Sequence, residues 1–226
     1  MPLDETIQQR LTAAFEAGRP LDLLNSFKGV PVRYKAVIQQ IEPEAVTILV
    51  AQREAVCLEL EREVVVLGEG GDEALRAEAS DVKLEQGRAR LTGIRYADSR
   101  LGNRLMVRVE PKAPMAVRLN LAGQSVTGRV VNLSMGGLAV QLAAPPDVPL
   151  KVGATVPLAF DLPSGPVQLA GLVRSVRPEG GGRRLGIAFP QDAHVSAIVS
   201  YVLQRRVEIL GELDQAYQAR LGRAAI

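Results

Sequence analysis

The sequence predicts a mainly β protein built from two small antiparallel β-barrels, with a helix at the N-terminus and a long helix at the C-terminus. Short apolar/polar alternations separated by turn residues fill two stretches, residues 30–96 and 116–189, and no helical periodicity interrupts either stretch. Apolar spacing typical of helices occurs only at the two ends. The composition, 47% hydrophobic and 23% charged, is that of an ordinary globular chain.

The first barrel is expected to follow a short helix. Asp4 is a suitable N-cap, Ile7 and Leu11 fall on one face, and Gly18 and Pro20 end the pattern. From Val30 the period changes to two. The expected strands cover residues 30–38, 45–51, 55–60, 62–67, 74–83 and 88–96. The single cysteine, Cys57, falls in the third of these strands and is assigned a structural role.

The second barrel is expected after a polar segment. Six further strands are predicted at residues 116–121, 128–132, 137–142, 155–162, 167–176 and 184–189, with turn-rich segments between them. The predicted division of the chain is residues 1–98 for the first barrel, 99–108 for a linker, 109–190 for the second barrel and 191–226 for the C-terminal helix.

The C-terminal helix carries two apolar stripes. The first includes Ile198 and Val202, and the second includes Ile209, Leu213 and Tyr217. Such a helix is longer than one small barrel can cover. Either the first stripe caps the barrel and the remainder frays, or the second stripe pairs with another copy of the chain to form a homodimer.

Composition also excludes several classes of protein. The N-terminus lacks an apolar region and no segment has about 18 uninterrupted apolar residues, so neither a signal peptide nor membrane insertion is expected. With one histidine and one cysteine, no catalytic triad, zinc ligand set or P-loop can be assembled. We therefore expect a cytoplasmic protein that is not an enzyme and holds no metal.

Charge is distributed unevenly along the chain. Residues 1–99 hold 12 Lys/Arg against 17 Asp/Glu, whereas residues 100–226 hold 15 against 8. The second half therefore favours an anionic ligand, unless the difference is a chance unevenness between two domains.

Two short motifs in this basic half carry the chemistry. Arg104 and Arg108 form R-L-M-V-R, and Asn132, Ser134 and Gly137 form N-L-S-M-G-G. The planar guanidinium fork matches phosphate oxygens and the O6/N7 edge of guanine, and its face stacks on a purine. Asn and Ser two apart on a strand end project to one face, where they can meet a guanine edge.

The two glycines of the second motif have two expected roles. Gly136 and Gly137 are expected to let the backbone turn with positive φ and to leave room for a ligand. Each motif alone is unspecific, because Asn, Ser and Gly are also ordinary turn residues. The specificity lies in their order, with the arginine pair ahead of the barrel and the turn motif between two of its strands.

Over residues 103–190 the chain resembles a PilZ domain, a β-barrel that binds cyclic di-GMP. The resemblance includes both motifs and a later R-L-G-I-A-F run. It implies that Arg104 and Arg108 clamp the ligand, and that Asn132, Ser134 and Gly137, with Gly136, hold a guanine. It also places Asn103 at a position whose residue influences how many ligand molecules bind. The F-K-G-V-P-V-R-Y-K-A-V run resembles, more loosely, the companion domain of YcgR-like proteins.

The resemblance implies a cyclic di-GMP receptor whose domains rearrange on binding and which regulates motility, exopolysaccharide or another, unidentified protein target. The alternative is a PilZ-like interaction scaffold that does not bind nucleotide. A nucleic-acid binder is not expected. The chain has no tryptophan, and the basic half has few aromatic residues on which bases could stack.

Overall fold

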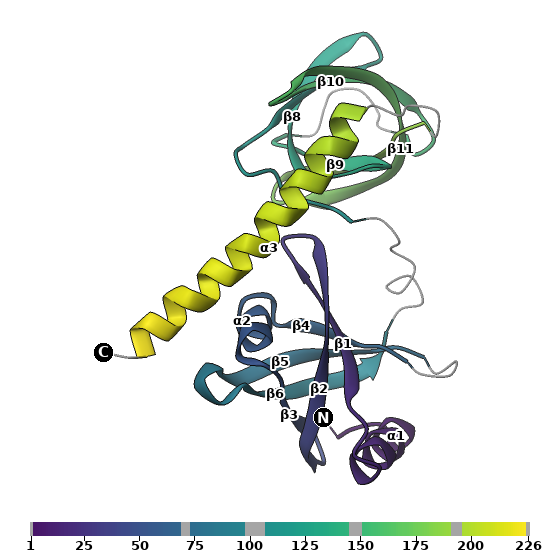
Figure 1. The fold of residues 1–226 in the computed structure, drawn as a ribbon. Coiled ribbons are helices and arrows are strands. Elements are labelled where there is room, and N and C mark those ends of the chain that lie inside the picture. Colours follow the sequence, from purple (N-terminus) through teal and green to yellow (C-terminus); the bar gives the residue numbers. More distant parts are fainter. Residues whose placement is uncertain (1, 69–72, 98–106, 145–150, 191–195, 225–226) are drawn as a thin grey trace. The chain divides into compact units, whose positions relative to one another are not determined.

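The computed structural model describes residues 2–68, 73–97, 107–144, 151–190 and 196–224 (Figure 1). The chain forms two compact units, Met1–Leu105 with Ile209–Ile226, and Met106–Glu208. Each unit contains one closed six-stranded barrel, so the predicted fold class is confirmed.

The first unit begins with α1 (Glu5–Glu16). The Asp4 carboxylate accepts the backbone N–H groups of Thr6 (3.0 Å) and Ile7 (3.3 Å), which satisfies two unpaired donors of the first turn. Ile7 and Leu11 are buried against the barrel core. The helix therefore forms and ends as its sequence pattern predicts.

The first barrel closes in the order β1-β2-β3-β6-β5-β4. Its strands are β1 (Leu21–Phe27), β2 (Val30–Glu42), β3 (Ala45–Leu49), β4 (Glu63–Val66), β5 (Leu75–Lys83) and β6 (Arg88–Tyr96). The 3-10 turn η1 (Leu84–Gln86) joins β5 to β6. Leu23, Ile48 and Leu91 are among its fully buried core residues.

Two predictions for this barrel are wrong. The strand expected at residues 55–60 is part of helix α2 (Gln52–Glu61), whose strong helix formers outweigh a short apolar alternation. The β1 strand was not predicted because polar Asp22 and Asn25 interrupt its pattern. Both are buried: Asp22 pairs with Lys35 (2.6 Å), and Asn25 Nδ2 donates to the Glu63 carbonyl oxygen (2.6 Å).

The second barrel closes in the order β10-β11-β12-β9-β8-β7. Its strands are β7 (Ala116–Leu121), β8 (Gln124–Ser134), β9 (Gly137–Leu142), β10 (Thr155–Leu162), β11 (Gly165–Glu179) and β12 (Gly182–Ala188). All six predicted strands are present. Alternate residues such as Val117, Leu119, Leu142 and Leu185 are almost fully buried inside the barrel.

Close packing between β9 and β12 depends on Gly137. A Cβ atom at this position would lie 2.3 Å from the Ile187 carbonyl oxygen and 3.1 Å from the Ala188 Cα atom. Gly137 has a positive φ of 159°, close to the extended limit, and Gly136 is not among the described residues with positive φ. The expectation of positive φ is therefore confirmed for Gly137 and wrong for Gly136, and Gly137 is also needed because the two strands approach closely.

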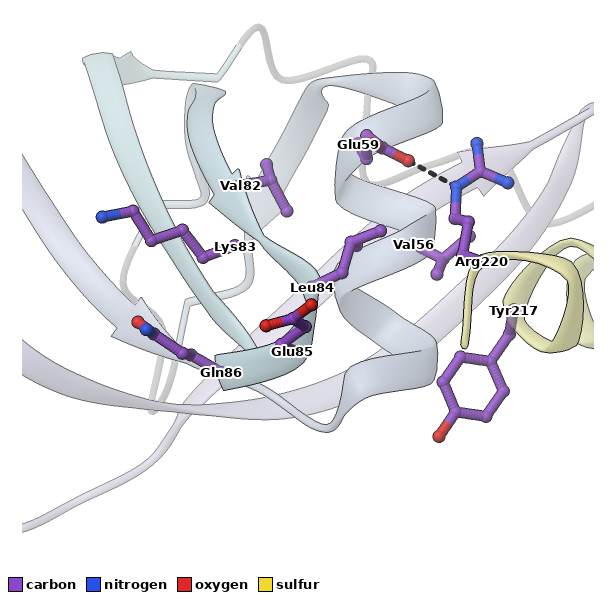
Figure 2. A pocket seen from close by; sticks show the side chains of 9 residues that line it. All are labelled: Val56, Glu59, Val82, Lys83, Leu84, Glu85, Gln86, Tyr217 and Arg220. Atoms are coloured by element: carbon purple, nitrogen blue, oxygen red, sulfur yellow. Dashed lines mark hydrogen bonds and ion pairs between the residues drawn. The ribbon is translucent and has the colours of Figure 1, made fainter. Parts of the chain in front are cut away.

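Helix α3 (Ser196–Ala224) supplies residues to both units, up to Glu208 in the second and from Ile209 in the first. Ile209 and Leu213 are fully buried within the chain. In the first unit Arg220 Nε donates to Glu59 at 2.6 Å (Figure 2). The Tyr217 hydroxyl donates to Gln52 Oε1 at 3.0 Å. The second stripe is therefore packed within the chain and does not fray, while a homodimer through this helix stays a prediction.

No described helix is long and apolar enough to cross a membrane.

The Cys57 thiol should be unreactive in the folded protein. It is fully buried on α2, and burial raises the pKa of the thiol to about 12, so the reactive thiolate is scarce at mildly alkaline pH. We expect no reaction with Ellman's reagent in native buffer, and one equivalent in denaturant. Rapid reaction of the native protein would contradict this burial.

Replacing Gly137 with Ala should destabilise the second unit by about 1–3 kcal/mol, because backbone atoms of β12 must move to admit the methyl group. Thermal or urea denaturation measures the change. The matched control is Gly211→Ala on α3, where an added Cβ meets no atom within 4 Å. This control should leave stability unchanged or raise it by up to about 1 kcal/mol. Equal stability of the two variants would contradict the packing argument.

Candidate functional site

An isolated backbone bridge joins the segment after the arginine motif to the end of β8. The Val109 N–H donates to the Leu133 carbonyl (2.8 Å), and the Leu133 N–H donates to the Val109 carbonyl (2.9 Å). Both side chains are fully buried, so they point into the barrel. Continued by one residue in each direction, the antiparallel pairing would set Arg108 opposite Ser134 and Glu110 opposite Asn132, with side chains that alternate away from the core.

A β-bulge at Val131 determines which side of β8 faces outward. Val130 pairs with Val140, whereas Asn132 pairs with Ala139, so Val131 is one extra residue on β8. Without it, strict alternation from the buried Val130 would turn Asn132 inward. The bulge instead puts Leu133 in the core and Asn132 and Ser134 on the outer side.

The turn that follows is tightly held. Ser134 pairs with Gly137 at the end of the β8–β9 hairpin, and the Ser134 hydroxyl donates to the Gly137 carbonyl oxygen at 3.0 Å. The Phe189 N–H donates to the Gly136 carbonyl (2.9 Å), which ties the turn to the end of β12. Ser134 is only 7% exposed, and this hydrogen bond fixes the direction of its hydroxyl.

Beside Asn132 and Ser134 the outer surface of the sheet carries only short side chains, and we call this area the low surface. The register continues from Asn132 to Ala139, Gly186 and Ser175, and from Ser134 to Gly137 and Ala188. A Cβ at Gly186 would lie 2.6 Å from the Ser175 hydroxyl oxygen. Short side chains across three strands leave room for a flat ring to approach the sheet.

The next outward row is basic. The register aligns Arg129, Gln141, Arg184 and Arg177 across β8, β9, β12 and β11. This row lies two residues along β9 from Ala139, roughly 7 Å away. Glu179 pairs with Arg184 at 3.2 Å and offsets one of the three charges. The remaining positive charge favours an anion over the low surface.

The structure describes only part of the predicted site. Arg108, Asn132, Ser134, Gly136 and Gly137 are described, and the bridge and hairpin bring them together. Asn103 and Arg104 lie outside the described residues. The prediction missed Ala139 and the Val109–Leu133 bridge, for which the sequence carries no local signal. Gly186 stands within the R-L-G-I-A-F run that was noticed for another reason.

A separate pocket of about 380 Å³ lies in the first unit, between α2, η1 and the end of α3 (Figure 2). Its lining is mixed in charge, with Glu59, Lys83, Glu85 and Arg220. Glu59 and Arg220 already pair with each other at 2.6 Å. None of the predicted ligand residues lines it, and its charged groups have no common sign to select a ligand.

Within the part of the chain that the structure describes, no group of three or more His, Cys, Asp or Glu residues could hold a metal ion.

Comparisons with known proteins address the second unit most directly. Residues 100–204 match the family model described as the PilZ domain. No curated protein matches the sequence significantly.

Several solved structures are similar to this chain at low identity. YcgR from Escherichia coli, in complex with c-di-GMP, is 16% identical over 96% of this chain and 93% of its own, with a TM-score of 0.41. MotI/DgrA, the inhibitor of motility of Bacillus subtilis, is 18% identical over 84% and 97%, with a TM-score of 0.42. The MrkH–c-di-GMP complex of K. pneumonia is 11% identical over 95% of each chain, with a TM-score of 0.41.

The family match agrees with the barrel and with the hairpin that carries Asn132, Ser134 and Gly137. Residues 100–204 are therefore identified as a PilZ domain.

Proposed function

We propose that this chain is a receptor for cyclic di-GMP, with Arg108, Asn132, Ser134 and Gly137 in the ligand site and no catalytic activity of its own. The observation that carries the proposal is the Val109–Leu133 bridge, which sets Arg108 opposite Ser134 on the outer side of a PilZ barrel. Arg104 and Asn103 are included on the strength of the sequence motif, and Gly136 as part of the turn.

The described groups suit the two chemical parts of this ligand. The Arg108 fork can hold phosphate oxygens two at a time or stack on guanine. Since the Ser134 hydroxyl donates its proton to the Gly137 carbonyl, its remaining lone pairs can accept from a guanine N–H group. The Asn132 amide offers both a donor and an acceptor beside it.

We further propose that binding alters the arrangement of the two units and so regulates a protein target. Arg104 and Arg108 stand on either side of the chain position at which the units divide, after Leu105. A ligand that holds both arginines would restrict the chain there. Small-angle scattering with and without cyclic di-GMP tests this step.

Because the proposed ligand is a cytoplasmic second messenger, we propose that the protein is cytoplasmic. No residue of this chain identifies its protein target. A scaffold that does not bind nucleotide is the competing function, and calorimetric titration with cyclic di-GMP separates the two. A parallel titration with single-stranded RNA tests our expectation that nucleic acid is not a ligand.

Replacing Arg108 with Ala should weaken cyclic di-GMP binding roughly 10- to 100-fold, since one charge-assisted contact contributes about 1.5–3 kcal/mol. Arg104→Ala should have a similar effect. Isothermal titration calorimetry measures both.

The matched control for these variants is Arg118→Ala. Arg118 is an exposed arginine of β7 in the same barrel, so the change removes the same charge away from the hairpin. We expect it to retain wild-type affinity within about twofold. Wild-type affinity in both Arg104→Ala and Arg108→Ala would rule out the arginine clamp.

Ser134→Ala should weaken binding less than Arg108→Ala, because one neutral hydrogen bond contributes about 0.5–1.5 kcal/mol. It should also lower stability, because the Gly137 carbonyl loses a buried donor. Denaturation and calorimetry on the same sample separate these effects. A variant that loses stability but keeps its affinity would assign Ser134 a purely structural role.

A further inference from the structure

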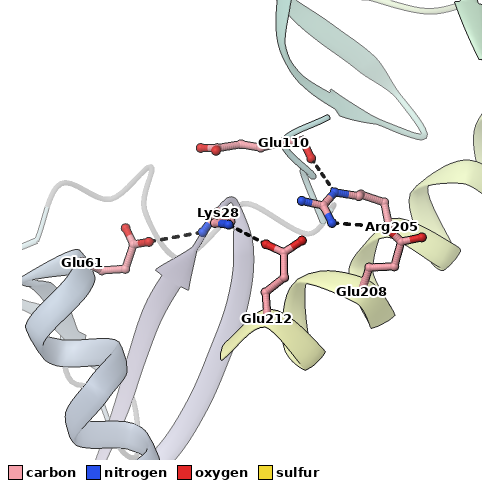
Figure 3. A network of polar contacts seen from close by, with 6 residues as sticks. All are labelled: Lys28, Glu61, Glu110, Arg205, Glu208 and Glu212. Atoms are coloured by element: carbon pink, nitrogen blue, oxygen red, sulfur yellow. Dashed lines mark hydrogen bonds and ion pairs between the residues drawn. The ribbon is translucent and has the colours of Figure 1, made fainter. Parts of the chain in front are cut away.

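Arg205 on α3 is the one lysine or arginine that is buried among the described residues, with 3% exposure. Its Nε donates to the Glu110 carbonyl oxygen at 2.8 Å, and its Nη1 lies 3.2 Å from Glu208 Oε2 (Figure 3). A buried guanidinium needs such partners, because removing the charge from water is costly. The residue stands one position beyond the region that matches the PilZ domain.

The segment that Arg205 contacts carries the proposed clamp. Glu110 follows Arg108 by two residues, and the single bridge at Val109 is the only strand-type pairing between residues 107 and 115. Arg205 therefore holds this segment from the helix while Leu133 holds it from β8. A second residue of α3, Tyr201, also contacts this segment, through a hydrogen bond with the Lys112 backbone. Burial raises the pKa of Tyr201, and this hydrogen bond opposes the rise.

We propose that Arg205 is a positioning residue for the ligand site, which fixes the backbone that presents Arg108 to cyclic di-GMP. The ligand half of this inference rests on the proposed function. By linkage, a ligand that orders residues 108–110 also stabilises the contact between this segment and α3.

A competing explanation is that the Arg205 charge attracts the anionic ligand from a distance. Arg205→Lys separates the two, because a lysine keeps the charge but lacks the planar fork that reaches both the carbonyl and the carboxylate. Arg205→Gln removes charge and fork together. Arg206→Gln is the matched control, since it removes an exposed charge from the next position of the same helix.

The first measurement is amide hydrogen exchange by NMR on the ligand-free full chain. In both Arg205 variants the Val109 and Leu133 amides should exchange at least about tenfold faster than in the wild type, because the segment opens locally more often. Amides in the β7–β10 pairing should keep their rates, which shows that the barrel remains folded. Arg206→Gln should match the wild type throughout.

The second measurement is calorimetric titration with cyclic di-GMP. We expect about 5- to 20-fold weaker binding in Arg205→Gln and Arg205→Lys, and unchanged binding in Arg206→Gln. Should Arg205→Gln fail to fold, Glu208→Gln weakens the anchor of the guanidinium while keeping the Glu110 contact. It should show the same changes at about two- to fivefold.

The outcomes are distinguishable. Unchanged exchange at Val109 and Leu133 in folded Arg205 variants would overturn the positioning role. Full affinity in Arg205→Lys together with a loss in Arg205→Gln would assign the effect to charge alone and also overturn it. Faster exchange in a protein whose wild type does not bind cyclic di-GMP would overturn the proposed function and the ligand half of this inference, while the backbone role stands.

Discussion

Two backbone hydrogen bonds between Val109 and Leu133 determine where the candidate site forms. They join residues 24 positions apart in the chain, and they are made by main-chain atoms, so the hydrogen bonds themselves do not depend on the type of side chain. Burial determines the pairing, because both side chains enter the barrel core. Once Val109 and Leu133 face inward, their neighbours Arg108, Glu110, Asn132 and Ser134 must face outward. The bulge at Val131 is the second condition, because without it the bridge would present the wrong side of β8.

The turn motif serves the fold as well as the proposed ligand. Ser134 donates a hydrogen bond to the Gly137 carbonyl oxygen. Because Gly137 has no Cβ atom, β9 can approach β12 closely. Asn, Ser and Gly are ordinary turn residues, so the motif alone does not indicate a ligand. The proposed ligand role depends on the neighbours of the hairpin, which are short side chains on β9 and β12, a row of arginines, and Arg108 from outside the hairpin.

The sequence predicted the second barrel better than the first, for a physical reason. In β7 to β12 the inward positions are apolar and the turns carry Gly, Pro and Asn, so local pattern and final structure agree. In the first barrel two errors cancelled in the number of strands. The β1 strand was missed because Asp22 and Asn25 are buried and paired, and α2 was predicted as a strand. The predicted number of strands was therefore right, although one predicted strand was a helix. Two of the contacts around the candidate site, Val109–Leu133 and Glu110–Arg205, could not be predicted, because they join residues 24 and 95 positions apart and local sequence patterns do not report such contacts.

The charges around the hairpin also constrain how a cyclic dinucleotide can lie. Its phosphates are anionic, whereas a guanine edge presents N–H donors. Arg108 and the Arg129, Arg184 and Arg177 row attract phosphate, but the exposed Glu110, opposite Asn132, repels it. A carboxylate can instead accept from guanine N–H groups. The same holds for the lone pairs that Ser134 retains after donating to Gly137. Under the proposed function, the ligand is therefore best accommodated with a guanine over the low surface beside Asn132 and its phosphates turned toward the arginines.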